Sequence, residues 1–464
     1  MSEFEFNNEI VYSSQKAIND LYKIAENYIY LQSGADERII PFEKYISRKI
    51  EILIASFLKS YPHENRNTQD LFSRIDKIYR NSLNFYEELL RNCIKASNTY
   101  KLGEVQGFYP AYGDTHNGGK TVSLVNFKGG SYFYKPRNLS IDIAYSESAA
   151  ALFGYSTEQN ILKISDSHGL VKRVPQFIDF SSKKSLSRFY FEYGRVFSFL
   201  YLLCASDMHS ANIINSQISP IVIDCETLLD PLSKNCKDNL KEMILNIGVI
   251  PGSIVERSNQ GESVDFSALA FRASPQKSFR PRLYLEDGKL KEEYLDIAPS
   301  KNIPYINKKS IPPKFFSSNF VDGCSSVLNN ALQNKNQWVE TIADNFSNCV
   351  SRIVLRDTHI YSSSLVSSLS LTGLESESNR LYRELSRQGN FDERIVFSEI
   401  QQIESGDIPY FNAGVDSLDL LGKGIRINNY FNKTGIDVCA ERIYELSQKD
   451  IEDISSIIID SFNR

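Results

Sequence analysis

The sequence lacks the signatures of several protein classes. Its seven cysteines include no CxxC pair, and their odd number and scattered positions argue against a disulfide framework and a zinc ribbon. No run of about 18 uninterrupted apolar residues occurs. The acidic start MSEFEFNNEI has no basic stretch followed by an apolar core. These absences exclude a signal peptide and a membrane span, and they favour a reducing cytoplasm.

A basic excess is lacking as well. Lys and Arg total 52 against 57 Asp and Glu, and the net charge of -5 argues against a general nucleic-acid binder. No internal repeat is found. What the chain has is length: its 464 residues, 42% of them hydrophobic and 12% aromatic, can bury a large core. We therefore expect a folded, enzyme-sized protein.

The hydrophobic pattern predicts three regions. Residues 1–98 carry apolar residues at helical steps on both sides of the polar loop YPHENRNTQD, which predicts a helical region. The pattern of residues 99–240 then changes to one typical of β-strands. TVSLVNF and SYFYKPR are predicted to form a hairpin around Gly129-Gly130, with Lys135 at the end of its second strand. An apolar helix over residues 186–205 and the short strand of PIVIDCETLL follow. Residues 241–464 are expected to be mixed helix with loops at prolines.

The segment after the apolar helix carries the strongest chemical signal. Asp207, His209 and Asn212 stand in SDMHSANII, and Asp224 follows the strand IVI. Asp207 and Asn212 have the spacing of the kinase catalytic loop. Phosphoryl transfer needs a carboxylate at the attacking hydroxyl, an Asn and an Asp for magnesium, and a Lys for phosphate, which Lys135 can supply. Each residue alone is more often a cap or turn residue, but the ordered set predicts an ATP-dependent phosphotransferase.

A glycine-bearing loop, GDTHNGGK, precedes the hairpin. The bare backbone at Gly118 and Gly119 could approach phosphates. The spacing is not G-x-G-x-x-G, and Asp114 and His116 are unusual in a phosphate cradle. The loop alone therefore does not identify a nucleotide site.

Six segments together carry a resemblance to a known family. From about residue 100 to about 415 the chain contains, in the family's order, GDTHNGGKTV, YFYKPRNLSIDIAY, SDMHSANII, PIVIDCETLLDP, SRIVLRDTHIY and SGDIPYF. These segments resemble the dehydratase domain of class II lanthionine (lanthipeptide) synthetases. The resemblance implies an α+β fold with a lipid-kinase-like two-lobed core, a helical N-terminal region and a largely helical C-terminal region carrying an elimination site.

The resemblance also implies an activity. Such an enzyme phosphorylates Ser and Thr of a ribosomally made precursor peptide, consisting of a leader and a core, with ATP and Mg²⁺. It then eliminates the phosphate to give dehydroalanine and dehydrobutyrine. Elimination needs a cation for the departing phosphate and a base for the α-proton.

Residue roles are carried over motif by motif. Phosphorylation would use Lys135, Asp207, His209, Asn212 and Asp224, with Gly118 and Gly119 at the nucleotide and Asn212, Asp224 and Glu226 at magnesium. Asp114 and His116 would line a phosphate loop shared by both steps. Elimination would rest on Arg352 and Thr358, with Arg356 close by. In a strand these three would share one face; without the resemblance an ordinary basic strand face is the simpler interpretation.

Departures from the family leave alternatives open. Family members continue into a zinc-dependent cyclase domain, whereas this chain stops at Arg464 and has no CxxC or CHG string. We expect no zinc, and a separate cyclase or other maturation enzyme as partner. The short N-terminal region leaves leader docking unassigned. A stand-alone dehydratase is preferred; the alternatives are a Ser/Thr peptide or small-molecule kinase without elimination, and a silent peptide-binding scaffold.

Overall fold

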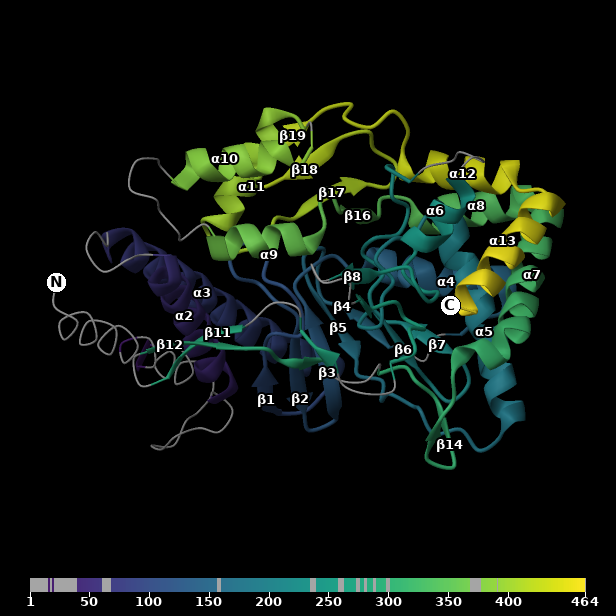
Figure 1. The fold of residues 1–464 in the computed structure, drawn as a ribbon, viewed down its shortest axis with the longest axis horizontal. Helices are drawn as coiled ribbons and strands as arrows, with labels where there is room; N and C mark the ends of the chain where they lie inside the picture. Colours follow the sequence, from purple (N-terminus) through teal and green to yellow (C-terminus); the bar gives the residue numbers. More distant parts are fainter. Residues whose placement is uncertain are drawn as a thin grey trace.

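A computed structural model describes most of the chain. It covers residues 16, 19–20, 40–60, 68–156, 160–233, 239–257, 263–272, 276–278, 282–286, 289–297, 301–367, 377–389 and 391–463. Helices and small sheets mix along these residues (Figure 1), which agrees with the predicted α+β class. No helix in this part of the chain combines the length and the apolarity needed to cross a membrane.

Two long helices and a five-stranded sheet form the first part of the fold (Figure 1). The helices α2 (Ile40–Ser60) and α3 (Thr68–Tyr100) are amphipathic, and their apolar faces share a core with the sheet around Phe42, Tyr86 and Phe108. The sheet is antiparallel, in the order β1-β2-β3-β5-β4. Its strands are β1 (Val105–Tyr109), β2 (Ser123–Phe127), β3 (Gly130–Lys135), β4 (Ile161–Lys163) and β5 (Gly169–Lys172).

The predicted hairpin is confirmed. Strands β2 and β3 pair with Phe127 opposite Gly130, and Gly130 adopts a φ of 142° that glycine favours. Lys135 is the last residue of β3, as predicted. Little of the predicted helical region before Ile40 belongs to the described residues, and residues 61–67 of the predicted loop lie outside them.

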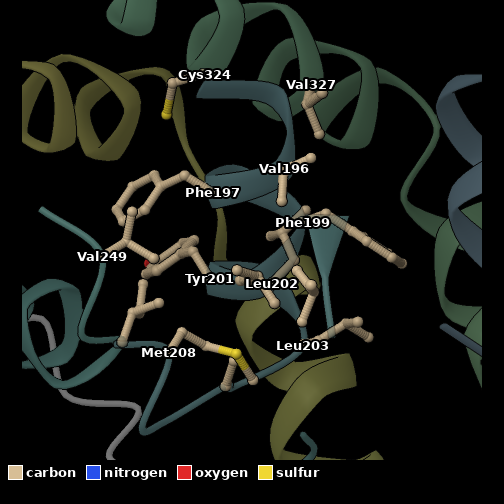
Figure 2. Packing of buried hydrophobic residues seen from close by; sticks show 14 of the residues in the cluster. Val196, Phe197, Phe199, Tyr201, Leu202, Leu203, Met208, Val249, Cys324 and Val327 are labelled. Atoms are coloured by element: carbon tan, nitrogen blue, oxygen red, sulfur yellow. The ribbon is translucent and has the colours of Figure 1, made fainter. Parts of the chain in front are cut away.

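A helical core forms the opposite end of the molecule (Figure 1). Helix α5 (Lys183–Leu202) is buried along most of its length and confirms the predicted apolar helix, although it ends three residues earlier than expected. Figure 2 shows Val196 and Phe197 of α5 facing Cys324 and Val327 of α7. The helices of this core besides α5 are α4 (Ser140–Phe153), α6 (Leu240–Asn246), α7 (Ser317–Gln333), α8 (Lys335–Phe346), α12 (Gly435–Glu445) and α13 (Gln448–Phe462).

Glycines allow α5 and α7 to approach each other closely. A Cβ atom on Gly194 would lie 1.9 Å from the carbonyl oxygen of Phe320, and one on Gly323 would lie 1.9 Å from that of Phe191. Both distances are far below van der Waals contact, so the crossing requires the absence of a side chain on both helices.

Residues 255–310 differ from the predicted mixed helix. The described parts of this region form short antiparallel pairs rather than helices, because each run between turn residues is only two to five residues long. The pairs are β8 (Val255–Arg257) with β9 (Ser263–Asp265), β10 (Gln276–Lys277) with β13 (Asp296–Ile297), β11 (Arg282–Glu286) with β12 (Lys289–Glu293), and β14 (Tyr305–Ile306) with β15 (Lys309–Ser310). A similar pair, β6 (Ile213–Asn215) with β7 (Pro220–Val222), carries the predicted strand before Asp224.

A four-stranded antiparallel sheet in the C-terminal region was not predicted. Its strands are β16 (Val350–Ile353), β17 (Phe411–Gly414), β18 (Leu420–Gly422) and β19 (Ile425–Ile427), and its neighbours are α9 (Thr358–Ser367), α10 (Glu377–Arg387) and α11 (Glu393–Ile403). The expectation that Arg352, Arg356 and Thr358 share one strand face is wrong. Strand β16 ends at Ile353, and Thr358 begins a helix.

Candidate functional site

One large cleft lies where the first sheet, the helical core and the C-terminal sheet meet. Its volume of about 2020 Å³ exceeds the roughly 300–1,000 Å³ of common small-molecule pockets. Most of the predicted site residues line it: Asp114, His116, Asp207, His209, Asn212, Asp224, Glu226, Arg352 and Thr358. The structure therefore brings together residues that are more than 200 positions apart in the sequence.

Lys135 lies beneath the cleft and is held by two carboxylates. Its side chain is 6% exposed, and Nζ lies 3.6 Å from Asp142 Oδ1 and 3.5 Å from Asp224 Oδ1. Nζ also donates to the carbonyl of Ile223. Asp142 comes from the first turn of α4, the helix that follows β3. The lysine at the end of the hairpin is thus fixed between the following helix and the segment after β7.

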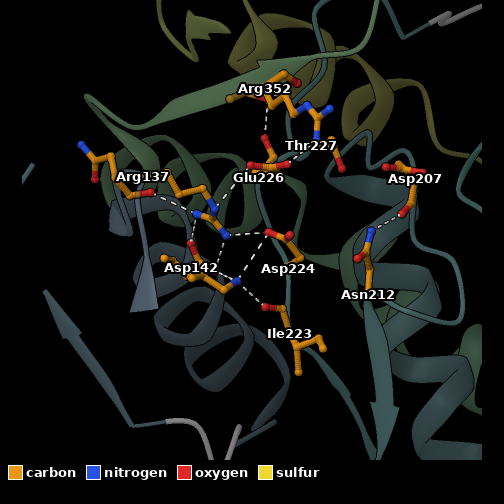
Figure 3. Close-up of polar contacts among 12 residues, drawn as sticks. Arg137, Asp142, Asp207, Asn212, Ile223, Asp224, Glu226, Thr227 and Arg352 are labelled. Atoms are coloured by element: carbon orange, nitrogen blue, oxygen red, sulfur yellow. Dashed lines mark hydrogen bonds and ion pairs between the residues drawn. The ribbon is translucent and has the colours of Figure 1, made fainter. Parts of the chain in front are cut away.

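Arg137 joins the same network and was not predicted. Its guanidinium contacts Asp142 at 2.6 Å and 3.0 Å, Asp224 at 2.6 Å and Glu226 at 3.4 Å (Figure 3). Burial would lower the pKa of Arg137, but Asp142 and Asp224 outweigh that effect and raise it. Arg137 therefore keeps a fixed positive charge at the centre of three carboxylates.

Glu226 links this network to Arg352. Arg352 Nη1 lies 2.6 Å from Glu226 Oε1, while Glu226 Oε2 faces Arg137 (Figure 3). The backbone N–H of Arg352 also donates to the carbonyl of Glu226 at 2.6 Å, and the guanidinium lies 5.5 Å from the centre of the Tyr410 ring. Both carboxylate oxygens of Glu226 are engaged by guanidinium groups. The role of Glu226 as a magnesium ligand stays a prediction.

The loop after α5 presents Asp207 to the cleft. Asp207 adopts φ +60°, which turns the chain sharply behind the buried helix. The side-chain amide of Asn212 donates to the backbone carbonyl of Asp207 at 2.8 Å (Figure 3), and His209 Nε2 lies 3.6 Å from Asp207 Oδ1. His209 Nδ1 accepts from the N–H of Ala211 at 3.1 Å, and the side-chain nitrogen of Asn212 lies 3.4 Å from Nε2. The predicted five-residue spacing thus closes one compact loop.

The two aspartates of the cleft have opposite electrostatic surroundings. Burial raises the pKa of Asp207, and His209 and Arg352 only partly oppose this. Burial would also raise the pKa of Asp224, but Lys135 and Arg137 outweigh it and hold that pKa well below its ordinary value. Asp224 is therefore a permanent anion, whereas Asp207 is the carboxylate better able to take up a proton.

The glycine loop is arranged differently from the prediction. The N–H groups of Gly118 and Gly119 donate to the carboxylate of Asp407 at 2.7 Å and 2.9 Å. A buried side chain of the protein therefore binds the two amides that were expected to cradle a phosphate. Asp114 and His116, on the same loop, do line the cleft.

His116 has a defined tautomer. Its Nδ1 lies 2.7 Å from the carbonyl oxygen of Ile408, which can only accept, so Nδ1 carries the proton and Nε2 keeps its lone pair. Burial, and then the charge of Arg352, lower the pKa of His116 to about 4. The imidazole is neutral at pH 7 and able to accept a proton.

Arg356 and Thr358 occupy different environments. The Arg356 side chain is 1% exposed and binds Glu399 at 2.7 Å and 3.1 Å and the carbonyl of Leu385 at 2.9 Å. It lies in the packing between α9, α10 and α11 and does not line the cleft. This differs from the predicted catalytic role of Arg356. Thr358 lines the cleft at the first residue of α9, where backbone N–H groups favour an anion.

Sequence reasoning missed several residues of the site. They are Arg137, Asp142, Tyr410, Asn412 and Asp407. The segments YFYKPRNLSIDIAY and SGDIPYF contain four of them, so the signal lay within segments already singled out. In the part of the chain that the structure describes, no group of three or more His, Cys, Asp or Glu side chains is arranged to hold a metal ion.

Comparisons with known proteins point to one family. A family model described as "Domain of unknown function (DUF4135)" matches residues 69–414, a range that contains every residue of the predicted site. The chain is also 22% identical over 373 residues to the lacticin 481/lactococcin biosynthesis protein LcnDR2 of Lactococcus lactis subsp. lactis. That similarity covers 75% of this chain and 39% of the relative, so the chain spans well under half the length of the relative.

Proposed function

The chain belongs to the DUF4135 family, and from that premise and the geometry of the cleft we propose that it is a lanthipeptide-type dehydratase. It phosphorylates Ser and Thr of a ribosomally made precursor peptide with ATP and eliminates the phosphate. Its similarity to a protein of lacticin 481/lactococcin biosynthesis supports this role. The substrate is the core of such a peptide, and the protein works in the cytoplasm.

The observation that carries the proposal is the set of contacts around Lys135. In protein kinases a lysine on a strand of the first lobe pairs with an acidic residue of the following helix and faces the phosphates. Lys135 ends β3 and pairs with Asp142 of α4 and with Asp224. Asp207 and Asn212 line the same cleft. The lipid-kinase-like two-lobed core is supported by three features: the first sheet, the helical core, and the ion pairs of Lys135 that lie between the two.

Phosphate addition uses Asp207. The hydroxyl oxygen of the substrate Ser or Thr forms a bond to the γ-phosphorus of ATP as the bond to ADP breaks, and the hydroxyl proton passes to the Asp207 carboxylate. The raised pKa of Asp207 suits this transfer. His209 orients that carboxylate from 3.6 Å. Lys135 and Arg137 supply positive charge for the transferring group.

The donor set fits magnesium on one side of the cleft. Lys135 and Arg137 both contact Oδ1 of Asp224, which leaves Oδ2 as an oxygen for a cation. The amide of Asn212 is oriented by its bond to Asp207 and offers its oxygen. Magnesium commonly binds through one or two protein ligands together with phosphates and water. When bound, it would neutralise phosphate oxygens.

Elimination uses the adjacent wall, which is formed by His116, Arg352 and Thr358. A base removes the α-proton of the phosphorylated residue, the electron pair forms the Cα=Cβ bond, and the Cβ–O bond breaks to release phosphate. His116 has a free Nε2 lone pair for that proton. Arg352 and the helix start at Thr358 offer positive charge to the departing phosphate. The net change is the loss of one water from the peptide for each ATP converted to ADP and phosphate.

A kinase without elimination is the second candidate, and one observation favours it. Glu226 neutralises Arg352 at 2.6 Å, so the cation needed by the leaving phosphate is already paired. Incubation with ATP, magnesium and a Ser/Thr-containing precursor separates the two. The dehydratase yields a peptide lighter by one water per modified residue, whereas accumulation of phosphopeptide identifies a kinase. If no precursor changes in mass and no ATP is turned over, the result would support the third alternative, a peptide-binding scaffold without catalysis.

A further inference from the structure

Two segments nearly 290 residues apart bind each other beside the cleft. One is the glycine loop, Gly113–Lys120, and the other is the turn Ser405–Tyr410 between α11 and β17. Besides the two bonds from glycine amides to Asp407, the N–H of Ile408 donates to the carbonyl of Thr115 at 2.9 Å. Thr115 Oγ1 donates to the carbonyl of Gly406 at 3.2 Å. With the bond from His116 to Ile408, five hydrogen bonds join these segments.

The carboxylate of Asp407 is fully buried at this junction. Its residue is 0% exposed, and each of its oxygens accepts from one glycine amide. Gly118 and Gly119 have successive φ values of 86° and 80°, which turns their N–H groups toward one point. Such a pair of amides is an anion site, and here the anion belongs to the chain itself.

Helices from the N-terminal region enclose the junction. Lys49 of α2 donates to Thr115 Oγ1 at 3.3 Å, and burial lowers the pKa of this lysine to about 8 against the opposing effect of Asp407. On α3, Asn81 approaches the glycine loop so closely that a Cβ on Gly119 would lie 3.3 Å from its Cβ. The junction is therefore a packed, largely dry contact among α2, the glycine loop and the turn.

The same turn leads into the strand that supports Arg352. Tyr410 precedes β17, its ring centre lies 5.3 Å from that of His116, and it lies beneath the guanidinium of Arg352. Asn412 pairs with Arg352 in the register of β16 and β17. The position of His116 relative to Arg352 is consequently set through Tyr410 and the turn that Asp407 anchors.

We infer that Asp407 is a positioning residue, which occupies the amide pair of the glycine loop in place of a nucleotide phosphate and holds His116 opposite Arg352. The expected effect of Asp407 on elimination rests on the proposed function. It assigns the ATP phosphates to the wall of Lys135 and Asp224 and removes Gly118 and Gly119 from nucleotide binding. Loss of the Asp407 charge should then impair elimination and leave nucleotide affinity intact.

The test compares Asp407→Asn with Thr115→Val, which weakens the junction from the other segment, and with the matched control Asp416→Asn on the exposed turn after β17. Three quantities are measured in the full chain: the dissociation constant of ATP with magnesium, the elimination rate on a synthetic phosphopeptide with ADP, and the His116 tautomer by ¹⁵N NMR. For the two junction variants we expect ATP affinity within about twofold of wild type, elimination slower by about 10²-fold from misplacement, and loss of the fixed Nδ1–H tautomer. The control should match wild type in all three.

Two results would overturn the inference. A tenfold or greater loss of ATP affinity in both junction variants would indicate that the amides of Gly118 and Gly119 bind the nucleotide after all. An unchanged His116 tautomer would show that the junction does not position this residue, whatever the rates. The tautomer needs no turnover, so it decides the inference even if wild-type protein fails to process any peptide and the proposed function itself is wrong. If Asp407→Asn does not fold, Thr115→Val carries the same comparison.

Discussion

At the residue scale, Asp207 and Arg352 stand on different walls of one cleft and should fail in different ways. Asp207→Asn removes the proton acceptor and keeps the shape, so phosphate addition should fall by about 10²–10⁴-fold. Arg352→Ala removes the cation for the leaving phosphate, so a phosphopeptide should accumulate. Mass spectrometry of the peptide over time distinguishes the two.

Controls for these two variants exist on the same surface. Asp166 lies at the cleft with a side chain 89% exposed, so Asp166→Asn should behave as wild type. If Asp207→Asn and Arg352→Ala stop at the same product, the assignment of one wall to each step is wrong.

His116 should make stability depend on pH. Its folded pKa of about 4 lies below the ordinary value near 6.5, so the unfolded chain binds the proton more readily. Its contribution to stability is therefore present above about pH 6.5 and is lost as pH falls toward 4. His116→Asn can keep a donor to Ile408 without titrating. We expect the free energy of unfolding of wild type to fall relative to this variant by about 1–2 kcal/mol between pH 7 and 5.

Urea unfolding of both proteins at the two pH values measures this difference. A constant difference between wild type and His116→Asn across this range would mean that His116 titrates alike in the folded and unfolded chains.

At the element scale, the crossing of α5 and α7 depends on Gly194. In a solvent-exposed helix alanine is favoured over glycine by roughly 0.5–1 kcal/mol. Here a Cβ would meet the carbonyl of Phe320 at 1.9 Å, so the clash outweighs that preference. Gly194→Ala should destabilise the protein by at least about 1–3 kcal/mol, as overpacking does. Arg188→Ala, on the exposed side of α5, is the control, and thermal unfolding of both tests the expectation.

The helices beside the C-terminal sheet depend on the ion pair of Arg356 and Glu399. Arg356→Met leaves the Glu399 charge buried, with Tyr361 as a side-chain donor at 2.6 Å, and should cost about 3–5 kcal/mol in chemical unfolding. The double variant Arg356→Met/Glu399→Leu should recover most of that loss. A stable Arg356→Met that has lost elimination would instead restore the catalytic role that the family resemblance implies.

The elements differ in how much the sequence reveals about them. The β2–β3 hairpin and helix α5 were predictable because the Gly129-Gly130 turn and a strongly apolar segment without internal proline are local signals. The loop from Asp207 to Asn212 was predictable for the same reason. Strands β17 to β19 span three or four residues, too few to show a two-residue period. Arg356 was misplaced because its partner Glu399 lies 43 positions away, and no local pattern reveals such a pairing.

At the scale of the whole molecule, both walls belong to one cleft, and this predicts how the intermediate behaves. Glu226 touches Arg137 on the phosphorylation wall and Arg352 on the elimination wall, so the two walls are adjacent. A phosphorylated residue should reach Arg352 without leaving the protein. When labelled precursor reacts in the presence of excess unlabelled phosphopeptide, we expect labelled dehydrated peptide and little free labelled phosphopeptide. Dilution of the label into a free phosphopeptide pool would show that the intermediate dissociates between steps.

The junction between the glycine loop and Asp407 also bears on synthesis. Gly118 and Asp407 are separated by 289 residues along the chain. At about 5–20 residues per second, roughly 15–60 s pass on the ribosome before the amides of the loop can meet their carboxylate. The nascent chain contains Lys135, Asp207 and Asp224 well before that moment. The residues that position His116 and Arg352, including Asp407 and Tyr410, are translated later. The cleft is therefore complete only after the segment that contains Asp407 has emerged.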